Sequence, residues 1–217
     1  MTDALEHLAQ LIATSPHNLV SRGERARVGT MHIPESLAVA KLLPVKEGSR
    51  WVDLGTGGGL PGLVLAVAHP SVEWTLIDAT QKKVAEVARF AEELELSNVH
   101  PIAGRAEALG HDPAYRGRFD GVVSRAVAPL PVVAELSRGF VHSGGVVAVV
   151  KGPRALEEMQ RSSKVLADPL RLTDLHSRVV PGTARATHLV MMRARGSVPT
   201  GYPRRDGVPR THPLGEP

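Results

Sequence analysis

The stretch WVDLGTGGGLPG, residues 51–62, combines one carboxylate with a run of glycines. An apolar strand, a glycine turn and a helix form a nucleotide-binding unit, because glycine lets the backbone approach a ligand closely. The pattern D-x-G-x-G-x-G starts at Asp53 and includes Gly55, Gly57 and Gly59. A carboxylate at this place would repel a phosphate at the helix N-terminus but would attract a cation. S-Adenosylmethionine carries an ammonium and a sulfonium, so the pattern predicts this methyl donor as the ligand, with Asp53 meeting the ammonium directly or through water.

The same turn also contains the pattern G-x-G-x-x-G, at Gly57, Gly59 and Gly62. This pattern occurs in dinucleotide-binding folds, whose pyrophosphate lies on the helix N-terminus. A nicotinamide-dependent dehydrogenase and a catalytically silent nucleotide-binding module are therefore alternatives, and Asp53 argues against both.

A second acid, Asp78, ends the next predicted strand, about 20 residues beyond the turn. Rossmann-like folds place an acid there against the ribose hydroxyls of the ligand. Asp78 could instead cap the helix that begins near Gln81, because aspartate is a preferred capping residue. Both interpretations are compatible with the fold.

These residues need an open parallel sheet to hold them, and the hydrophobic pattern predicts one. Strands alternate with helices, which is typical of a parallel sheet covered by helices on both faces. We expect strands at 50–54, 73–78, 99–103, 119–124, 145–150, 171–179 and 187–195, the last two as an antiparallel hairpin. We expect helices at 3–13, 36–43, 60–68, 81–94, 131–140 and 154–166. The expected fold class is α/β, with a mostly parallel seven-stranded sheet.

The chain of 217 residues fits a single domain, which we place at 1–196 with a helical extension over about 1–45. Residues 197–217 are rich in Gly, Pro and Arg, so we expect a basic tail without a packed element. No apolar run approaches the roughly 20 residues of a membrane helix, and Asp3 and Glu6 stand where a signal peptide would be basic. We therefore expect a cytoplasmic protein that does not enter a membrane.

The amino-acid composition excludes several classes of catalytic and metal site. The chain has no cysteine, which excludes disulfides, thiolate metal sites and a cysteine nucleophile. The ten histidines form neither H-x-H nor H-E-x-x-H, so we expect no catalytic metal. Residues 171–217 hold eight arginines against three acids, a balance that suits a phosphate-rich partner but also a solvated basic tail.

Several segments together resemble one known family. They are Asn18-Leu19-Val20-Ser21, DLGTGGGLPG at 53–62, NVHPIAGRAEAL at 98–109, FDGVVSRAVAPL at 119–130, Lys151-Gly152 and YPRRDGVP at 202–209. In this order they resemble the bacterial small-subunit ribosomal RNA guanine-N7 methyltransferases, also called glucose-inhibited division protein B. The resemblance covers most of the chain and implies a class I methyltransferase fold. It also implies S-adenosylmethionine as donor and 16S ribosomal RNA, or a small-subunit particle, as partner; we expect a monomer.

The resemblance also implies site residues. Cofactor contacts are expected at Gly55, Leu60, Ala106, Glu107 and Arg125. Glu107 could otherwise be an exposed acid at a helix start, and Arg125 a member of a surface salt bridge.

Basic residues at the sheet edge and in the tail are expected to bind or position the RNA that accepts the methyl group. Arg125 and Lys151 would position the reactants, and RNA contacts are expected at His32, Lys151, Arg204 and Arg205. Lys151 could equally be a plain surface lysine. If the tail serves RNA alone, removing residues 197–217 should leave the affinity for the donor intact.

Motifs that are absent from the sequence exclude some classes of methyl acceptor. Exocyclic-amine methyltransferases carry a N/D-P-P-Y/F loop after the fourth strand, where this chain has the residues SRAV at 124–127, and carbon-5 enzymes use a cysteine. Guanine N7 has a free lone pair and needs neither. The family segment R-H-x-x-D-S reads Met31-His-Ile-Pro-Glu-Ser36 here, and Asp206 replaces an expected proline. A class I methyltransferase with another acceptor, such as a different RNA base, a protein or a small molecule, is therefore the alternative.

Overall fold

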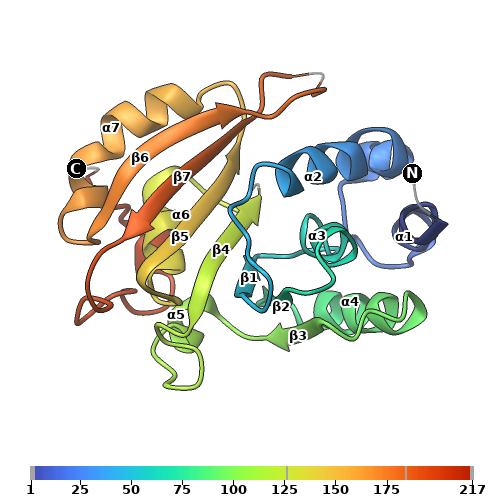
Figure 1. Ribbon diagram of the computed structural model, residues 1–217, viewed down its shortest axis with the longest axis horizontal. Helices are drawn as coiled ribbons and strands as arrows, with labels where there is room; N and C mark the ends of the chain where they lie inside the picture. The colour runs from blue at the N-terminus through green and yellow to red at the C-terminus, as the bar shows by residue number, and fades with distance from the viewer. Residues whose placement is uncertain (1–2, 126, 184, 216–217) are drawn as a thin grey trace.

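The computed structural model describes residues 3–125, 127–183 and 185–215, and it centres on one twisted sheet (Figure 1). The strand order is β3-β2-β1-β4-β5-β7-β6. The strands are β1 Arg50–Leu54, β2 Glu73–Asp78, β3 Val99–Ala103, β4 Phe119–Arg125, β5 Val141–Lys151, β6 Leu172–Val179 and β7 His188–Ala194. Neighbours from β3 to β5 pair in parallel, whereas β7 runs antiparallel to both β5 and β6. The predicted seven-stranded sheet with its closing hairpin is therefore confirmed.

Helices cover both faces of the sheet. They are α1 Asp3–Thr14, the 3-10 helix η1 Arg22–Arg27, the π-helix η2 Val28–His32, α2 Ile33–Ala40, α3 Gly62–Ala68, α4 Gln81–Glu93, α5 Ala106–Leu109, α6 Leu130–Arg138, α7 Ala155–Ala167 and α8 Val208–Thr211. One core joins α1 to α4 with one face of the sheet, and a second core joins α6 and α7 with the other face. Successive residues of β5 alternate between the cores, with Ala148 in the first and Val149 in the second, as the two-residue period of a strand requires.

Register brings the ends of three strands to one edge. Asp53 of β1 lies opposite Val123 of β4, and Arg125 of β4 lies opposite Val150 of β5. The carboxyl ends of β1, β4 and β5 therefore meet at the edge where open α/β sheets bind their ligands.

The N-terminal extension is helical, as expected, but its second helix starts earlier than predicted. α2 begins at Ile33, and Pro34 lies in its first turn, where a missing N–H costs no hydrogen bond. The 3-10 and π turns that precede it, from Arg22 to His32, have no simple hydrophobic period and were not predicted.

The expectation that no packed element follows residue 196 is wrong. Pro203 and Pro209 are buried, residues 208–211 form α8, and this helix packs on α6. The composition is typical of a loop, but polar groups of the domain bind the backbone of this segment. Among the described residues, no helix is long and apolar enough to cross a membrane.

Candidate active site

The glycine turn after β1 is held by backbone groups of β2. Gly55, Gly57 and Gly59 adopt φ angles of 74°, 58° and 86°, a region that side chains with a Cβ disfavour. The N–H groups of Gly55 and Thr56 both donate to the carbonyl of Ile77, at 2.8 and 2.9 Å. The turn therefore lies against the end of β2 with its glycine backbone open to a ligand.

Asp53 lies beneath this turn and is fully buried. Its Oδ2 accepts a 2.9 Å hydrogen bond from the N–H of Gly62, the first residue of α3. A Cβ on Gly62 would come within 2.5 Å of that oxygen, so the contact needs glycine. Oδ1 has no hydrogen-bond partner among the described residues. Burial raises the pKa of Asp53 to about 6, while the nearby hydroxyl of Thr56, the N–H of Gly62 and the charge of Arg125 act in the opposite direction.

Asp78 braces the same turn from the end of β2. One carboxylate oxygen accepts from the N–H of Gly57 at 3.0 Å, and the other accepts from the N–H of Thr80 at 2.8 Å, just before α4. The N-cap of α4 is Thr80, so Asp78 does not cap the helix as one of the two interpretations expected; it joins the segment before α4 to the glycine turn.

Three further predicted cofactor positions are buried or half-buried. Leu60 is buried within the glycine turn, and Glu107 is buried on α5, where its Oε1 accepts a 3.1 Å hydrogen bond from the N–H of Gly207. Ala106, beside it, is half-buried. Glu107 is therefore not an exposed acid at a helix start.

Comparison with known proteins identifies the family. The model of the family "rRNA small subunit methyltransferase G" (GidB) matches residues 1–194. A protein named ribosomal RNA small subunit methyltransferase G in Deinococcus deserti is 43% identical over 164 residues, which are 75% of this chain and 67% of that protein. The protein of the same name in Deinococcus radiodurans is 36% identical over 198 residues, 91% of this chain and 78% of that protein. The chain belongs to this family.

Solved structures agree with the fold. Fibrillarin of Aeropyrum pernix, in complex with S-adenosylmethionine, has a TM-score of 0.59 at 20% identity, over 74% of this chain and 76% of that one. The [4+2]-cyclase SpnF has a TM-score of 0.63 at 15% identity, over 90% and 94% of the two chains. The predicted class I methyltransferase fold is confirmed, and so is S-adenosylmethionine as the donor of this family.

The residues of the turn fit this donor. A buried carboxylate oxygen without a partner suits the donor's ammonium, and three glycines with positive φ shape the turn that covers Asp53. Glu107 and Asp78 supply carboxylate oxygens, which accept hydrogen bonds from hydroxyl and amine groups.

At the end of β4, Arg125 belongs to a network that the sequence did not reveal. Its Nη1 donates to Glu35 Oε2 at 3.1 Å and lies 3.3 Å from His32 Nδ1. The other oxygen of Glu35 accepts from the hydroxyl of Thr187 at 3.0 Å. Glu35 stands where the family pattern has aspartate, so this departure keeps a carboxylate next to Arg125.

The environment of His32 keeps its ring neutral. Its Nδ1 faces the Arg125 guanidinium and its Nε2 lies 2.9 Å from Glu24 Oε2. Burial lowers the pKa of His32, and the positive charge of Arg125 lowers it further. A neutral ring can accept from Arg125 at Nδ1, whereas Nε2 and Glu24 Oε2 lie close together without hydrogen-bond geometry.

Lys151, at the end of β5, is also paired. Its ammonium lies 2.7 Å from Glu158 Oε2 on α7 and donates to the carbonyl of Ala128 at 3.1 Å. Glu158 in turn accepts from the N–H of Leu130. Lys151 therefore holds the loop between β4 and α6 and is not a free surface lysine.

The two tail arginines differ. Arg204 binds the carboxylate of Glu135, which is fully buried, with its Nη2 2.7 Å from Oε2. Arg205 is exposed and makes no side-chain hydrogen bond or ion pair to any described residue. Of these two arginines, Arg205 has the guanidinium without a protein partner among the described residues.

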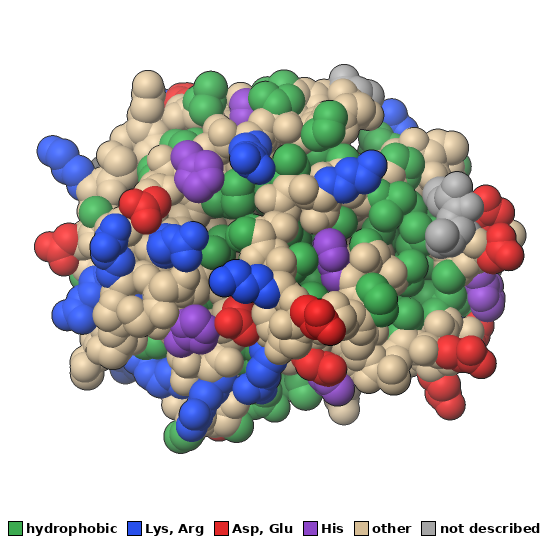
Figure 2. Space-filling view, in the orientation of Figure 1, with side chains coloured by type: hydrophobic (Ala, Val, Ile, Leu, Met, Phe, Trp, Pro, Cys, Tyr) green, Lys and Arg blue, Asp and Glu red, His purple; other side chains and the backbone are tan. Residues whose placement is uncertain are grey.

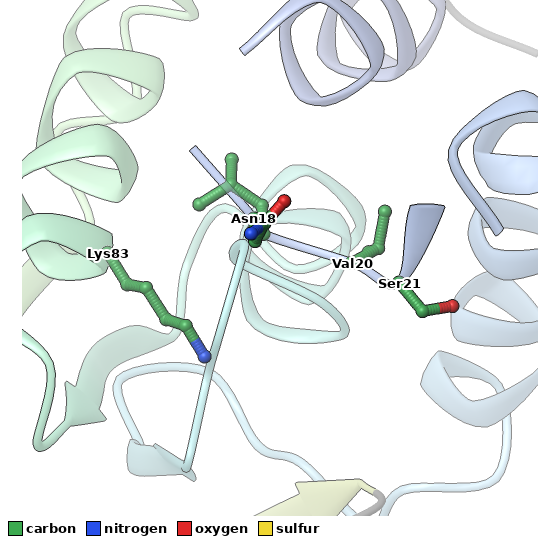
Figure 3. A pocket seen from close by; sticks show the side chains of 5 residues that line it. Asn18, Val20, Ser21 and Lys83 are labelled. Carbon is green, nitrogen blue, oxygen red and sulfur yellow. The ribbon is translucent and has the colours of Figure 1, made fainter. Parts of the chain in front are cut away.

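A hollow of about 400 Å³ adjoins the glycine turn and is lined by residues 18–21 and Lys83. Figure 3 shows Lys83 extending from α4 into the space beside this segment. Leu19 packs on the turn so closely that a Cβ on Gly58 would come within 2.7 Å of the Leu19 Cβ. The resemblance pointed to residues 18–21, but no pattern pointed to Lys83.

Proposed function

We propose that this protein transfers the methyl group of S-adenosylmethionine to N7 of a guanine in 16S ribosomal RNA. The observation that carries the proposal is the buried Asp53 carboxylate beneath a glycine turn at the carboxyl edge of the sheet, in a chain of this methyltransferase family. This arrangement offers a negative charge to a cationic donor and not to a pyrophosphate.

We further propose the residues that hold the donor. Asp53 receives its ammonium, and the backbone of Gly55, Gly57 and Leu60 lines its methionine half. Asp78 accepts from the ribose hydroxyls, and Ala106 and Glu107 lie beside the adenine. These roles are supported by the partnerless oxygen of Asp53 and by the buried carboxylate of Glu107.

The chemistry needs little from the protein beyond placement. When bound, the donor supplies a methyl group on a sulfonium. The sulfur keeps the bonding electron pair and leaves as a neutral thioether, so the leaving group needs no proton. The N7 lone pair of guanine is free at neutral pH, so no side chain has to remove a proton. The protein therefore works by holding lone pair, methyl carbon and sulfur in line, which can lower a barrier by several kcal/mol.

Arg125 and Lys151 are proposed to position the acceptor. Both lie at the carboxyl ends of central strands, and both are held by carboxylates, Glu35 and Glu158. An arginine whose fork is already oriented loses less side-chain entropy when it binds a base or phosphate. His32, held neutral against Arg125, is proposed to contact RNA at the same edge.

The RNA backbone is proposed to lie over the basic half of the molecule. Figure 2 shows Lys and Arg side chains gathered over the part that carries β5, β6 and β7, whereas Asp and Glu are more frequent around α1 and α4. Exposed arginines there include Arg193, Arg195, Arg205 and Arg210. With only seven aromatic residues in the chain, charge has to carry more of the binding than base stacking.

We propose that the protein acts in the cytoplasm, where ribosomal RNA is modified, and as a monomer. The large exposed hydrophobic side chains among the described residues are Leu156 and Val179, which lie on different elements, α7 and β6. They offer little apolar surface for a second copy.

Mapping N7-methylguanosine in 16S ribosomal RNA from cells with and without this protein tests the proposal. We expect one guanine to lose its methyl group when the protein is absent and to regain it when the protein is restored. A restored Asp53→Ala protein should not return the modification. Unchanged N7 methylation would refute the proposed acceptor.

A further inference from the structure

We infer that the C-terminal strap, residues 199–211, forms one wall of the methyl-donor site and positions Glu107. The family model ends at residue 194, so the strap lies beyond the matched region. The inference rests on the proposed function, because it takes Gly55 and Glu107 as donor contacts. It contradicts the expectation that the C-terminal segment serves RNA alone.

The strap is anchored by polar side chains that bind its backbone. Arg116 donates to the carbonyls of Pro199 and Tyr202, at 3.0 and 2.8 Å. His111 Nε2 lies 2.7 Å from the carbonyl of Pro203. Arg116 and His111 belong to the segment that follows α5, so the start of the strap is fixed next to the helix that carries Glu107.

Pro203 wedges the strap into the domain. Its ring lies so close to two glycines that a Cβ on Gly110 would come within 2.9 Å of it, and one on Gly139 within 3.0 Å. Gly110 follows α5 and Gly139 follows α6. The strap therefore crosses between these two helices at a place where only glycine leaves room.

Arg204 secures the next residue of the strap. Its backbone N–H and its guanidinium bind Glu135 on α6, and its Nη2 also donates to the carbonyl of His212 at 2.8 Å. Hydrogen bonding to Glu135 raises the pKa of Arg204. An arginine bound in this way stabilises the path of the chain and has few donors left for RNA.

Beyond Arg204 the strap contacts Glu107 on α5 and the loop that packs on the glycine turn. The N–H of Gly207 donates to Glu107 Oε1 at 3.1 Å. In the loop, Arg210 Nη2 donates to the carbonyl of Val127 at 3.4 Å. Val127 itself lies on the turn, since a Cβ on Gly55 would come within 2.5 Å of its Cγ2. The strap thus bridges the two residues that border the donor site.

The contact with Gly207 decides how Glu107 can act. It occupies one carboxylate oxygen and fixes the rotamer, which leaves the other oxygen to accept from an amine or hydroxyl of the adenosine half of the donor. Gly207 has a φ of 79°, so glycine is needed to aim its N–H at Glu107. Asp206, which replaces the expected proline, lies 3.8 Å from Arg105 at the start of α5 and adds an exposed contact on the same side.

A chain that ends after Arg205 tests the inference. It keeps Pro203 and the Arg204–Glu135 pair but lacks Asp206, Gly207 and Arg210. We expect calorimetry to show S-adenosylmethionine and S-adenosylhomocysteine binding about 10-fold more weakly, the loss typical of one hydrogen bond to a carboxylate. A chain that ends after His212 keeps all of α8 and serves as the matched control, with the affinity of the full chain.

The shortened chain should also be combined with Glu107→Gln. If the strap acts through Glu107, the two changes together should weaken donor binding little more than the larger of the two alone. Thermal unfolding reports whether the shortened chain is folded, and Gly207→Ala provides a local test with the whole chain present. We expect that variant to bind the donor several-fold more weakly, because alanine disfavours the φ of Gly207.

The outcomes separate the two ideas. If the full chain does not bind S-adenosylmethionine, the proposed function fails. If the full chain binds it and both the shortened chain and Gly207→Ala bind equally well, the strap is no part of the donor site and this inference alone is overturned.

Discussion

Around the glycine turn, hydrogen bonds run between the backbone and two aspartates, whereas at the ends of β4 and β5 they join charged side chains. The glycine turn draws its contacts from residues 53–78, close together in the sequence. At the end of β4, Arg125 meets Glu35 and His32, about 90 residues earlier in the chain, and Glu35 meets Thr187 of the closing hairpin. The glycine turn is thus built locally, whereas the network around Arg125 depends on the whole fold.

The difference also concerns charge. Asp53 is buried with one oxygen unpartnered, so its charge is costly until a cation arrives. Arg125 and Lys151 already have carboxylate partners. The buried Asp53 carboxylate therefore favours the binding of a cation, whereas the carboxylate partners of Arg125 and Lys151 fix the orientation of these two side chains.

The largest effect expected on the donor side concerns stability. The folded pKa of Asp53 is about 6 against an ordinary value of 3.8, so between these values the folded chain holds a proton that the unfolded chain has lost. Its contribution is therefore fully present below about pH 3.8 and is lost as pH rises through about 6, by about 3 kcal/mol in total. Asp53→Asn keeps an acceptor for Gly62 and should escape this loss.

Urea unfolding of both proteins without donor, between pH 4.5 and 7.5, measures this effect. The stability of Asp53→Asn relative to the natural chain should grow as pH rises. A constant difference across this range would show that the carboxylate does not titrate as its burial implies. Glu47→Gln, at an exposed site where Glu47 makes no ion pair with a described residue, is the control.

Donor affinity should respond almost as strongly. Asp53→Ala removes the proposed charged hydrogen bond to the ammonium and should weaken S-adenosylmethionine binding by about 1.5–3 kcal/mol. NAD should not bind measurably to either protein. Calorimetry on purified protein gives both numbers, and normal donor binding by the alanine variant would remove Asp53 from the site.

On the acceptor side the expected effects are on rate. Arg125→Ala and Lys151→Ala should each slow single-turnover methyl transfer by about 10-fold or more, the cost of one charged contact. Glu35→Gln should slow transfer in the same direction but less, since it loosens Arg125 without removing it. Arg161→Ala, an exposed arginine on α7, is the matched control.

The pH profile sharpens the same test. No general base is expected, so the rate should vary little between about pH 6.5 and 8.5, away from unperturbed carboxylates and lysines. A steep rise with pH that disappears in Arg125→Ala, Lys151→Ala or His32→Ala would show that a proton is removed. An amine or hydroxyl acceptor would then replace guanine N7.

The smallest effect distinguishes the two neighbouring arginines. Arg205→Ala should reduce the slope of log affinity for RNA against log salt by about 0.7–0.9, the share of one phosphate contact. Arg204→Ala should lower the stability of the fold, because it leaves the buried Glu135 without its ion-pair partner. Fluorescence titrations with a 16S RNA fragment at several salt concentrations, together with thermal unfolding, measure both. Equal salt slopes for the two variants would contradict the assignment.

Much of this molecule follows from short stretches of sequence. The alternation of strands and helices predicted all seven strands, and three of them, β1, β2 and β3, match to the residue. The glycine turn with Asp53 predicted the methyl donor, because a φ above zero and a buried acid are properties of a few adjacent residues. Such local rules act before the chain is packed, so they can be read without the fold.

Only the tertiary structure decided what the charged residues do. Arg125 meets Glu35, Lys151 meets Glu158 and Arg204 meets Glu135, and nothing in the spacing of these pairs predicts them. The basic segment after residue 196 has the composition of a loose tail, but the half-buried Arg116 and the carboxylates of Glu135 and Glu107 bind its backbone and hold it against α5 and α6. A charge can be counted from sequence alone, whereas the partner that neutralises it is chosen by packing between distant segments.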